Sequence, residues 1–157
     1  MAVGHSFGGA TCLTACNSDL RFKACAVFDV WLFPLSLAMA HATLRIPTLF
    51  LVAETFDNLW PKEGRKTFDN LWPKEGRKVL DGFLRRARAS GVPIEAFKVI
   101  GSRHQNFSDF PVLAPGFTQA LGMAGPTKPS VVIEVANKCA ISFLLHNHES
   151  TEAVTWV

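Results

Sequence analysis

Short apolar runs and longer amphipathic stretches alternate along the 157 residues of this chain. The clearest apolar run is TLFLVA at residues 48–53, a pattern that predicts a strand buried on both faces. Residues 79–90 place their apolar side chains on one side of a helix and their arginines on another. Alternation of this kind is typical of βαβ units, so the sequence predicts an α/β fold with a mostly parallel sheet flanked by helices.

The other expected elements continue the same alternation. Strands are predicted at residues 1–3, 24–28 and 96–101, and the first of these is only a stub. A helix is predicted at residues 8–17, and Ser130 is expected to cap a last helix. The apolar stripe of that last helix consists of Val132, Val135, Ala136, Cys139, Phe143 and Leu144.

A twelve-residue segment, TFDNLWPKEGRK, occupies residues 55–66 and occurs again unchanged at residues 67–78. Two copies are too few for a repeat architecture. Each copy contains Trp-Pro and Glu-Gly, which interrupt regular structure, so both copies are predicted to lie in a loop after the third strand. A recent duplication, a sequence artefact and a functional extension all remain open, and the first two leave the function untouched.

Composition narrows the class of protein. Hydrophobic residues make up 48% and charged residues 18% of the chain, which fits a single globular domain over residues 1–157. The net charge of +3 arises from 16 basic and 13 acidic residues without a nucleic-acid-binding motif, so no nucleic-acid partner is expected. No signal-peptide pattern or membrane-spanning run is evident, and a cytoplasmic or secreted location and the oligomeric state stay open.

The four cysteines are flanked by apolar or small residues: Cys12, Cys16, Cys25 and Cys139. They form no C-x-x-C pair, and a zinc site would need ligands that the sequence does not assemble. Buried free thiols are therefore expected, with neither a metal ion nor another cofactor.

Candidate chemistry lies in the first residues, GHSFGG. Gly4, Ser6 and Gly8 match G-x-S-x-G, the strand-to-helix turn that displays a nucleophilic serine in α/β hydrolases. Together with Gly9, the two glycines are expected to permit a tight turn and close packing. The backbone N–H of Phe7, directly after the serine, is the expected oxyanion donor. A serine nucleophile also needs a histidine base and a carboxylate that orients it, in the chain order Ser, Asp/Glu, His.

His104 in SRHQNF follows the fourth predicted strand, where the base of such a triad should lie. His5 lies inside the serine turn and His41 lies in a loop. His146 and His148 end the last helix, where a polar or positive residue is favourable anyway. These four histidines fit the role of base less well than His104.

Spacing alone leaves the acid open. Asp29 ends the second predicted strand, whereas Glu54 and Asp57 follow the third, which is the more common position in α/β hydrolases. The tandem segment also supplies Asp69 as a copy of Asp57.

Five blocks of the chain resemble, in order, the platelet-activating factor acetylhydrolases, the phospholipase A2 family that acts without calcium. These blocks are GHSFGGAT, RFKACAVFDVWLFPL, IPTLFLVAE, GSRHQNFSDF and NKCAISFLL. The resemblance implies that Ser6 is the nucleophile, that His104 is the base and that Asp29, within D-x-W-x-F-P-L, is the acid. It further implies that this chain is the C-terminal portion of an α/β-hydrolase domain whose first strands and second oxyanion donor lie outside it.

The activity implied is that of a serine esterase acting on platelet-activating-factor-like glycerophospholipids. Such an enzyme removes the sn-2 acetyl group, or a short or oxidised acyl group, through an acyl-serine intermediate and without a metal. The resemblance also implies peripheral contact with a membrane or lipoprotein surface through residues 110–125, with core packing of this run as the alternative. Two other functions stay open: a general carboxylesterase or lipase with Glu54 or Asp57 as acid, and a non-catalytic lipid-surface-binding fragment.

The isolated chain is expected to be marginally stable or prone to aggregate. Its first strand would lack a partner on one side, which leaves a sheet edge and apolar surface exposed. Loss of one oxyanion donor costs about 2.7–4 kcal/mol of barrier lowering, so the activity of the chain alone is left open.

Overall fold

The computed structural model describes residues 1–56 and 72–152. Strands and helices alternate along these residues, as the pattern of apolar positions predicts. The elements in chain order are β1 (Ala2–His5), α1 (Phe7–Ser18), β2 (Cys25–Phe28), α2 (Leu37–Ala40), β3 (Thr48–Ala53), α4 (Trp72–Ser90), β4 (Ile94–Val99), the short 3-10 helix η1 (His104–Phe107), α5 (Phe110–Leu113), α6 (Pro115–Ala120) and α7 (Pro129–Glu152).

The four strands form one parallel sheet in the order β1-β2-β3-β4. Cys25 pairs with both Ala2 and Thr48, and Thr48 pairs with Ile94, so the strands start in register. The predicted α/β class with a parallel sheet flanked by helices is confirmed. Since all four strands are parallel, the residues that follow β1, β2 and β3 lie together at the carboxyl ends of the strands.

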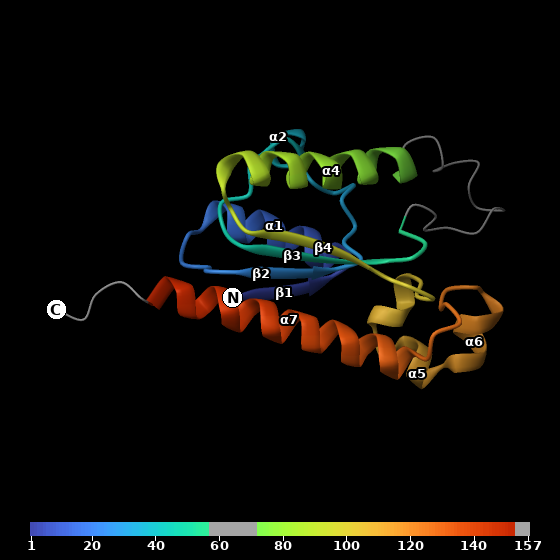
Figure 1. The fold of residues 1–157 in the computed structure, drawn as a ribbon. Coiled ribbons are helices and arrows are strands. Elements are labelled where there is room, and N and C mark those ends of the chain that lie inside the picture. Colours follow the sequence, from blue (N-terminus) through green and yellow to red (C-terminus); the bar gives the residue numbers. More distant parts are fainter. Residues whose placement is uncertain (57–71, 153–157) are drawn as a thin grey trace.

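Helices cover both faces of the sheet (Figure 1). On one face, α1, α2 and α4 pack against Val27 of β2 and against Phe50 and Val52 of β3. On the other face, α7 packs against Phe28 and Leu51. All six residues of β3 are buried, with successive side chains on opposite faces, which explains why its sequence is an unbroken apolar run.

Helix α4 corrects the prediction that both copies of the tandem segment lie in a loop. The helix begins at Trp72, so the last seven residues of the second copy are helical. Pro73 is tolerated because it falls in the first turn, where its missing N–H has no helical partner to lose. Gly76 costs only about 1 kcal/mol in a helix, and an ion pair between Arg77 and Asp81, 3.4 Å apart, supports the next turn. Residues 57–71 lie outside the described part of the chain, so the loop placement of the rest stays a prediction.

The last helix also begins earlier than expected. Ser130 is not its cap, because α7 starts at Pro129 and the Lys128 carbonyl already accepts from the Val132 amide at 3.2 Å. Proline is favourable at the first helical position, so the helix can begin at Pro129 without a polar cap at Ser130. Of the predicted stripe, Val132 is buried whereas Val135 is 40% exposed.

Strand β3 matches its prediction residue for residue, whereas β4 is shifted. The predicted strand at residues 96–101 is found two residues earlier, at Ile94–Val99. Gly101 ends it with a left-handed backbone angle, φ 71°. The Ser102 amide donates to the Val99 carbonyl at 3.3 Å, so the chain turns directly after the strand.

The segment after η1 forms α5 and α6, and most of its large apolar side chains face outward. The exposed fraction is 80% for Leu113 and 56% for Phe117, while Pro111 and Thr118 are buried. The sequence from Phe110 to Pro126 contains no charged residue. Core packing therefore does not account for this run.

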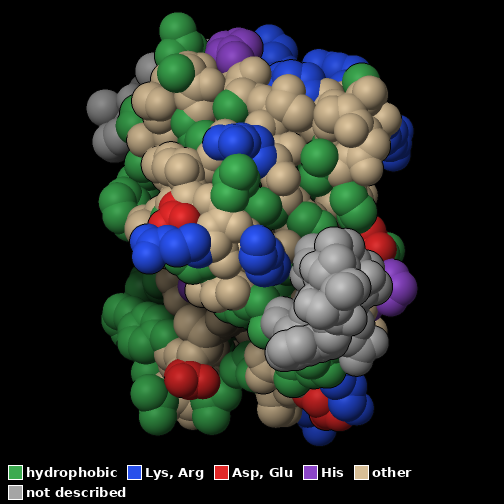
Figure 2. All heavy atoms as spheres, turned by 90° about the vertical axis from the view of Figure 1, so that its left-hand side faces the viewer, with side chains coloured by type: hydrophobic (Ala, Val, Ile, Leu, Met, Phe, Trp, Pro, Cys, Tyr) green, Lys and Arg blue, Asp and Glu red, His purple; other side chains and the backbone are tan. Residues whose placement is uncertain are grey.

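Charge is distributed without a single dominant patch on the face shown in Figure 2, where Lys and Arg side chains are spread among hydrophobic ones. All four thiols are free; Cys16 and Cys25 are buried, and the other two are half-buried. Among residues 1–56 and 72–152, the helices are all too short or too polar to cross a bilayer.

Candidate active site

Ser6 lies on a strained turn between β1 and α1. Its backbone angles are φ 56° and ψ −122°, a combination that a non-glycine residue adopts only when its surroundings enforce it. The Ser6 amide donates to the Phe28 carbonyl at 3.0 Å, and the Ser6 carbonyl accepts from the Trp31 amide at 2.9 Å. The end of β2 and the segment just beyond it thus hold the backbone on both sides of the serine side chain.

Two of the three glycines in this turn are required by space. A Cβ on Gly4 would overlap the Gly8 carbonyl, and one on Gly9 would lie 2.9 Å from a Val30 methyl carbon. A Cβ on Gly8 would meet nothing within 4 Å, so the expectation of close packing does not hold there.

Ser6, His104 and Asp29 form one chain of hydrogen bonds. Ser6 Oγ lies 2.9 Å from His104 Nε2, and His104 Nδ1 lies 2.7 Å from Asp29 Oδ2. Because a carboxylate only accepts, the proton of the neutral imidazole sits on Nδ1. His104 Nε2 is then left with a lone pair that accepts from the Ser6 hydroxyl.

Asp29 is completely buried and fixed by the sheet. It follows β2 directly with φ 38°, a second left-handed non-glycine residue. Its amide donates to the Leu51 carbonyl at 2.7 Å, and its Oδ1 accepts from the Ala53 amide at 2.7 Å. Both carboxylate oxygens are thus used, one to hold the side chain on β3 and one to contact His104.

The alternative acids do not reach His104 in the described part of the chain. Glu54 Oε2 instead accepts from the Gly101 amide at 2.9 Å, tying the end of β3 to the end of β4. Asp57 and Asp69 lie outside the described residues. The geometry therefore favours Asp29, where spacing had left the choice open.

Asn106 holds the turn that carries His104, a role that no motif in the sequence indicates. It is fully buried; its Oδ1 accepts from the Arg103 amide at 2.7 Å and from the Gly125 amide at 2.6 Å. Its Nδ2 donates to the Thr127 carbonyl at 3.0 Å. An asparagine two residues after a candidate base was a signal, but its remote partners could not be read from the sequence.

His5 is also part of the site, although the sequence favours His104 over it as the base. Its Nε2 lies 3.1 Å from the His104 carbonyl oxygen, and the two rings are 4.7 Å apart at their centroids. Burial, followed by the charge of His104, lowers the pKa of His5 to about 4. His41 lies elsewhere, exposed, with its Nδ1 2.9 Å from the Leu37 carbonyl.

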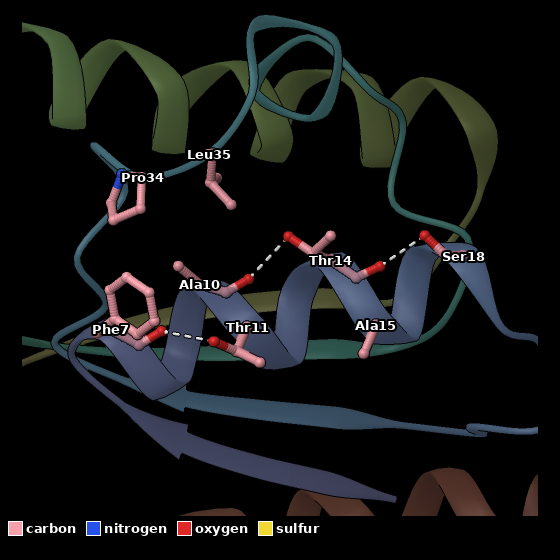
Figure 3. A pocket seen from close by; sticks show the side chains of 8 residues that line it. All are labelled: Phe7, Ala10, Thr11, Thr14, Ala15, Ser18, Pro34 and Leu35. Atoms are coloured by element: carbon pink, nitrogen blue, oxygen red, sulfur yellow. Dashed lines mark hydrogen bonds between the residues drawn. The ribbon is translucent and has the colours of Figure 1, made fainter.

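Phe7 is the first residue of α1, so its N–H has no carbonyl one turn earlier and stays available next to Ser6. Its ring is 57% exposed and borders a groove of about 370 Å³ along α1 (Figure 3). The lining consists of Phe7, Ala10, Thr11, Thr14, Ala15, Ser18, Pro34 and Leu35. Neither Ser6 nor His104 lines this groove, so it is not where the hydrogen-bonded chain would act.

Among the described residues, no group of three or more His, Cys, Asp or Glu side chains is placed to bind a metal ion.

Comparison with known proteins identifies the family of this chain. A sequence model of the family described as platelet-activating factor acetylhydrolase, isoform II, matches residues 1–156. The chain belongs to this family. The chain is also 29% identical over 143 residues to a platelet-activating factor acetylhydrolase of Canis lupus familiaris, a match that covers 90% of this chain.

Two other relatives extend the comparison. The match to the acetylhydrolase of Gallus gallus is 23% identical, and the match to a putative phospholipase A2 of Schizosaccharomyces pombe is 25% identical over 94% of this chain. The matched region is 28% of the dog protein, 29% of the chicken protein and 37% of the yeast protein. The chain thus spans only about a third of the length of these relatives.

Proposed function

We propose that this chain carries the nucleophile, base and acid of a serine esterase that acts on platelet-activating-factor-like glycerophospholipids. The observation that supports this best is the continuous hydrogen-bonded chain from Ser6 Oγ through His104 to the buried carboxylate of Asp29. The family and the names of the relatives support the choice of an acetyl or other short acyl ester at sn-2.

In the proposed reaction, Ser6 Oγ attacks the carbonyl carbon of the sn-2 ester while His104 Nε2 takes the hydroxyl proton. Asp29 holds Nδ1 and stabilises the imidazolium that forms. The tetrahedral intermediate then collapses, the bond to the glycerol oxygen breaks, and that oxygen leaves with the proton from His104. Water next attacks the acyl-serine, again giving its proton to His104, and the carboxylic acid is released as Ser6 is restored.

The negative oxygen of the tetrahedral intermediate needs donors at the site where charge develops. We assign one donor to the Phe7 N–H at the start of α1, where the positive end of the helix dipole adds to the stabilisation. A serine hydroxyl made nucleophilic by a base does not require a metal-bound water. The proposal therefore includes neither calcium nor another cofactor.

The test is hydrolysis of 2-acetyl and 2-palmitoyl glycerophosphocholines by the purified chain and its variants. Ser6→Ala should abolish turnover, and Asp29→Asn should lower kcat by about 10⁴ because the tautomer of His104 is no longer enforced. Glu54→Gln should change kcat by no more than about fivefold, since it weakens one hydrogen bond at an exposed position.

Other outcomes would favour the alternative functions. Equal hydrolysis of short and long acyl chains would indicate a general carboxylesterase or lipase. A large loss in Glu54→Gln or Asp57→Asn, with little in Asp29→Asn, would move the acid to the later strand. Absent turnover would leave a non-catalytic lipid-binding role, whereas turnover unaffected by Ser6→Ala would show that Ser6 is not the nucleophile.

We further propose that α5 and α6 contact the lipid surface from which the substrate is drawn. Leu113 and Phe117 are the two most exposed large apolar side chains of these helices, in a stretch without charge. Leu113→Asp with Phe117→Asp should reduce co-sedimentation with phosphatidylcholine vesicles at least threefold, because both charges would oppose insertion. The change should leave hydrolysis of a monomeric ester unaltered; unchanged sedimentation would contradict the assignment.

A further inference from the structure

His5 occupies an unusual place for a histidine that is not the base. It ends β1 and directly precedes Ser6, and its ring lies against the rings of His104 and Phe107, with centroid separations of 4.7 and 6.2 Å. Its strand partner in the sheet register is Phe28, the residue before Asp29. His5 therefore precedes Ser6 in the chain, contacts His104 with its ring and pairs with the residue before Asp29.

The protonation of His5 follows from its partner. The His104 carbonyl oxygen, 3.1 Å from His5 Nε2, can only accept, so Nε2 must carry the proton and donate. Burial and the nearby His104 keep the pKa of His5 low, at about 4, although Asp29 and the hydrogen bond to His104 oppose this shift. The ring is thus a neutral donor at pH 7, and it adds no positive charge beside the imidazole that must gain one during the reaction.

The hydrogen bond acts on the backbone of His104 itself. His104 begins a 3-10 turn of four residues after β4, which by itself is a short and weakly fixed element. Before His104, the Arg103 side chain donates to the Gly122 carbonyl at 2.6 Å, and after it the Gln105 amide donates to the Met123 carbonyl at 3.2 Å. These bonds hold the neighbours of His104 on either side. His5 adds a bond to the carbonyl of His104 itself, and this bond comes from the residue next to the nucleophile.

We propose that His5 is a positioning residue, whose Nε2–H holds the His104 backbone so that the His104 ring stays between Ser6 and Asp29. This inference rests on the proposed function for its effect on rate, but the hydrogen bond and the placement of the ring can be tested without it. The bond from His5 thus connects the strand end that carries Ser6 to the turn that carries His104, although Ser6 and His104 are 98 positions apart in the chain.

The test compares four variants in their reaction with a fluorophosphonate ester. His5→Phe keeps an aromatic ring but loses the N–H donor. His5→Gln keeps an N–H that can reach the His104 carbonyl oxygen, whereas the shorter side chain of His5→Asn cannot reach it. His41→Phe is the matched control, because His41 is another histidine bonded to a backbone carbonyl, but at an exposed position outside the site.

The maximal rate of modification of Ser6 should fall about 10–100-fold in His5→Phe and His5→Asn, because a small displacement of the base is costly in rate. The reagent concentration that gives half of the maximal rate should stay within about twofold of the wild-type value, because the proposed role of His5 is to position His104 and not to bind the reagent. His5→Gln should recover to within about fivefold of the wild-type rate, and His41→Phe should match it.

A structural readout separates this inference from the proposed function. In proton NMR spectra, the strongly downfield Nδ1 proton of His104, bonded to Asp29, should be present in wild type and His5→Gln and lost or broadened in His5→Phe and His5→Asn. Ser6 that fails to react in wild type would overturn the proposed function, while the NMR signal would still decide the role of His5. Wild-type rates and an unchanged signal in folded His5→Phe, or an equal loss in His5→Gln and His5→Asn, would overturn the inference.

Discussion

Two residues of the candidate site hold backbone angles that ordinary side chains avoid. Ser6 has φ 56° and Asp29 has φ 38°, and each directly follows a parallel strand. Strain of this kind costs about 1–3 kcal/mol per residue and survives only where the surroundings enforce it. Both residues are enforced by backbone hydrogen bonds to the neighbouring strand or to the segment just beyond it, so the sheet stores the strain where the chemistry would take place.

Replacing the strained serine by glycine should therefore stabilise the fold relative to alanine. Ser6→Gly relieves the positive φ, whereas Ser6→Ala keeps it, and the greater freedom of glycine in the unfolded chain offsets part of the gain. We expect the free energy of unfolding in urea to be about 1 kcal/mol higher for Ser6→Gly, with both variants inactive. A less stable Ser6→Gly would show that the turn is not strained.

The low pKa of His5 makes stability depend on pH. Its pKa of about 4 in the folded chain lies below its ordinary value of 6.5, so the unfolded chain binds more protons as the pH falls through this range. The free energy of unfolding therefore has its full value above pH 6.5. As the pH falls toward 4, it drops by on the order of 2 kcal/mol for this partly exposed ring. The neighbours that bear on it are His104 and Asp29.

His5→Gln should accordingly lose less stability than wild type between pH 7 and pH 4.5. Urea unfolding at both pH values measures the two differences, and the other titrating groups are common to both proteins. Equal losses would contradict a depressed pKa for His5.

At the residue scale, the sequence indicated Ser6 and His104 through a motif and a strand end, both of which are local signals. Choosing Asp29 over Glu54 required the family resemblance, since both carboxylates follow strands of the same sheet. The supporting roles of His5 and Asn106 depend on contacts across about 100 and 20 residues of chain, respectively. Neither periodicity nor a motif indicates such long-range contacts, so only the three-dimensional structure shows them.

At the element scale, β3 ties the site together. Its Leu51 carbonyl and Ala53 amide hold Asp29, and Glu54, directly after it, holds Gly101 at the end of β4. The three strand ends thus place the acid next to the turn that carries His104. The short η1 depends on Asn106 for its attachment to residues 125–127.

Removing that attachment should destabilise the chain. Asn106→Ala leaves the Arg103 and Gly125 amides without their acceptor in a buried setting, at a cost of about 1–3 kcal/mol for such groups. Asn17→Ala is a suitable control, because Asn17 accepts one bond, from the Arg45 amide, at an exposed position. Urea unfolding that shows equal losses for the two variants would contradict the structural role of Asn106.

Element boundaries were predicted well where the burial of side chains determines them, and poorly where the first residues of a helix determine them. The fully buried β3 was predicted residue for residue, because an apolar run with turns on both sides has one interpretation. Helices α4 and α7 both begin earlier than predicted, at Trp72 and Pro129. In each helix a proline lies in the first turn, where the helix tolerates it, so Pro73 does not interrupt α4 and Pro129 begins α7.

At the scale of the whole molecule, β1 lies at one edge of the described sheet and pairs with β2. Val3 in this strand is 51% exposed. Edge strands with exposed apolar side chains promote association, and a lysine on such an edge opposes it. The family relatives are much longer than this chain, but the edge itself is a property of the sheet described here.

The purified chain should therefore associate as its concentration rises, and Val3→Lys should reduce the association. Sedimentation velocity over a hundredfold range of concentration measures both. Phe97→Lys tests the other edge of the described sheet, because Phe97 on β4 is equally exposed, at 51%. A larger reduction by Phe97→Lys than by Val3→Lys would assign the association to β4 instead of β1. A wild-type chain that stays monomeric and unfolds cooperatively would contradict the expected role of this edge.

The most direct test of the central claim is to locate the adduct after reaction with a fluorophosphonate ester. Peptide mapping by mass spectrometry should find the adduct on Ser6 in the wild-type chain, much less of it in Asp29→Asn, and none in Ser6→Ala. An adduct on another residue, or a wild-type chain that stays unmodified, would contradict the assignment of Ser6, His104 and Asp29 as a catalytic triad.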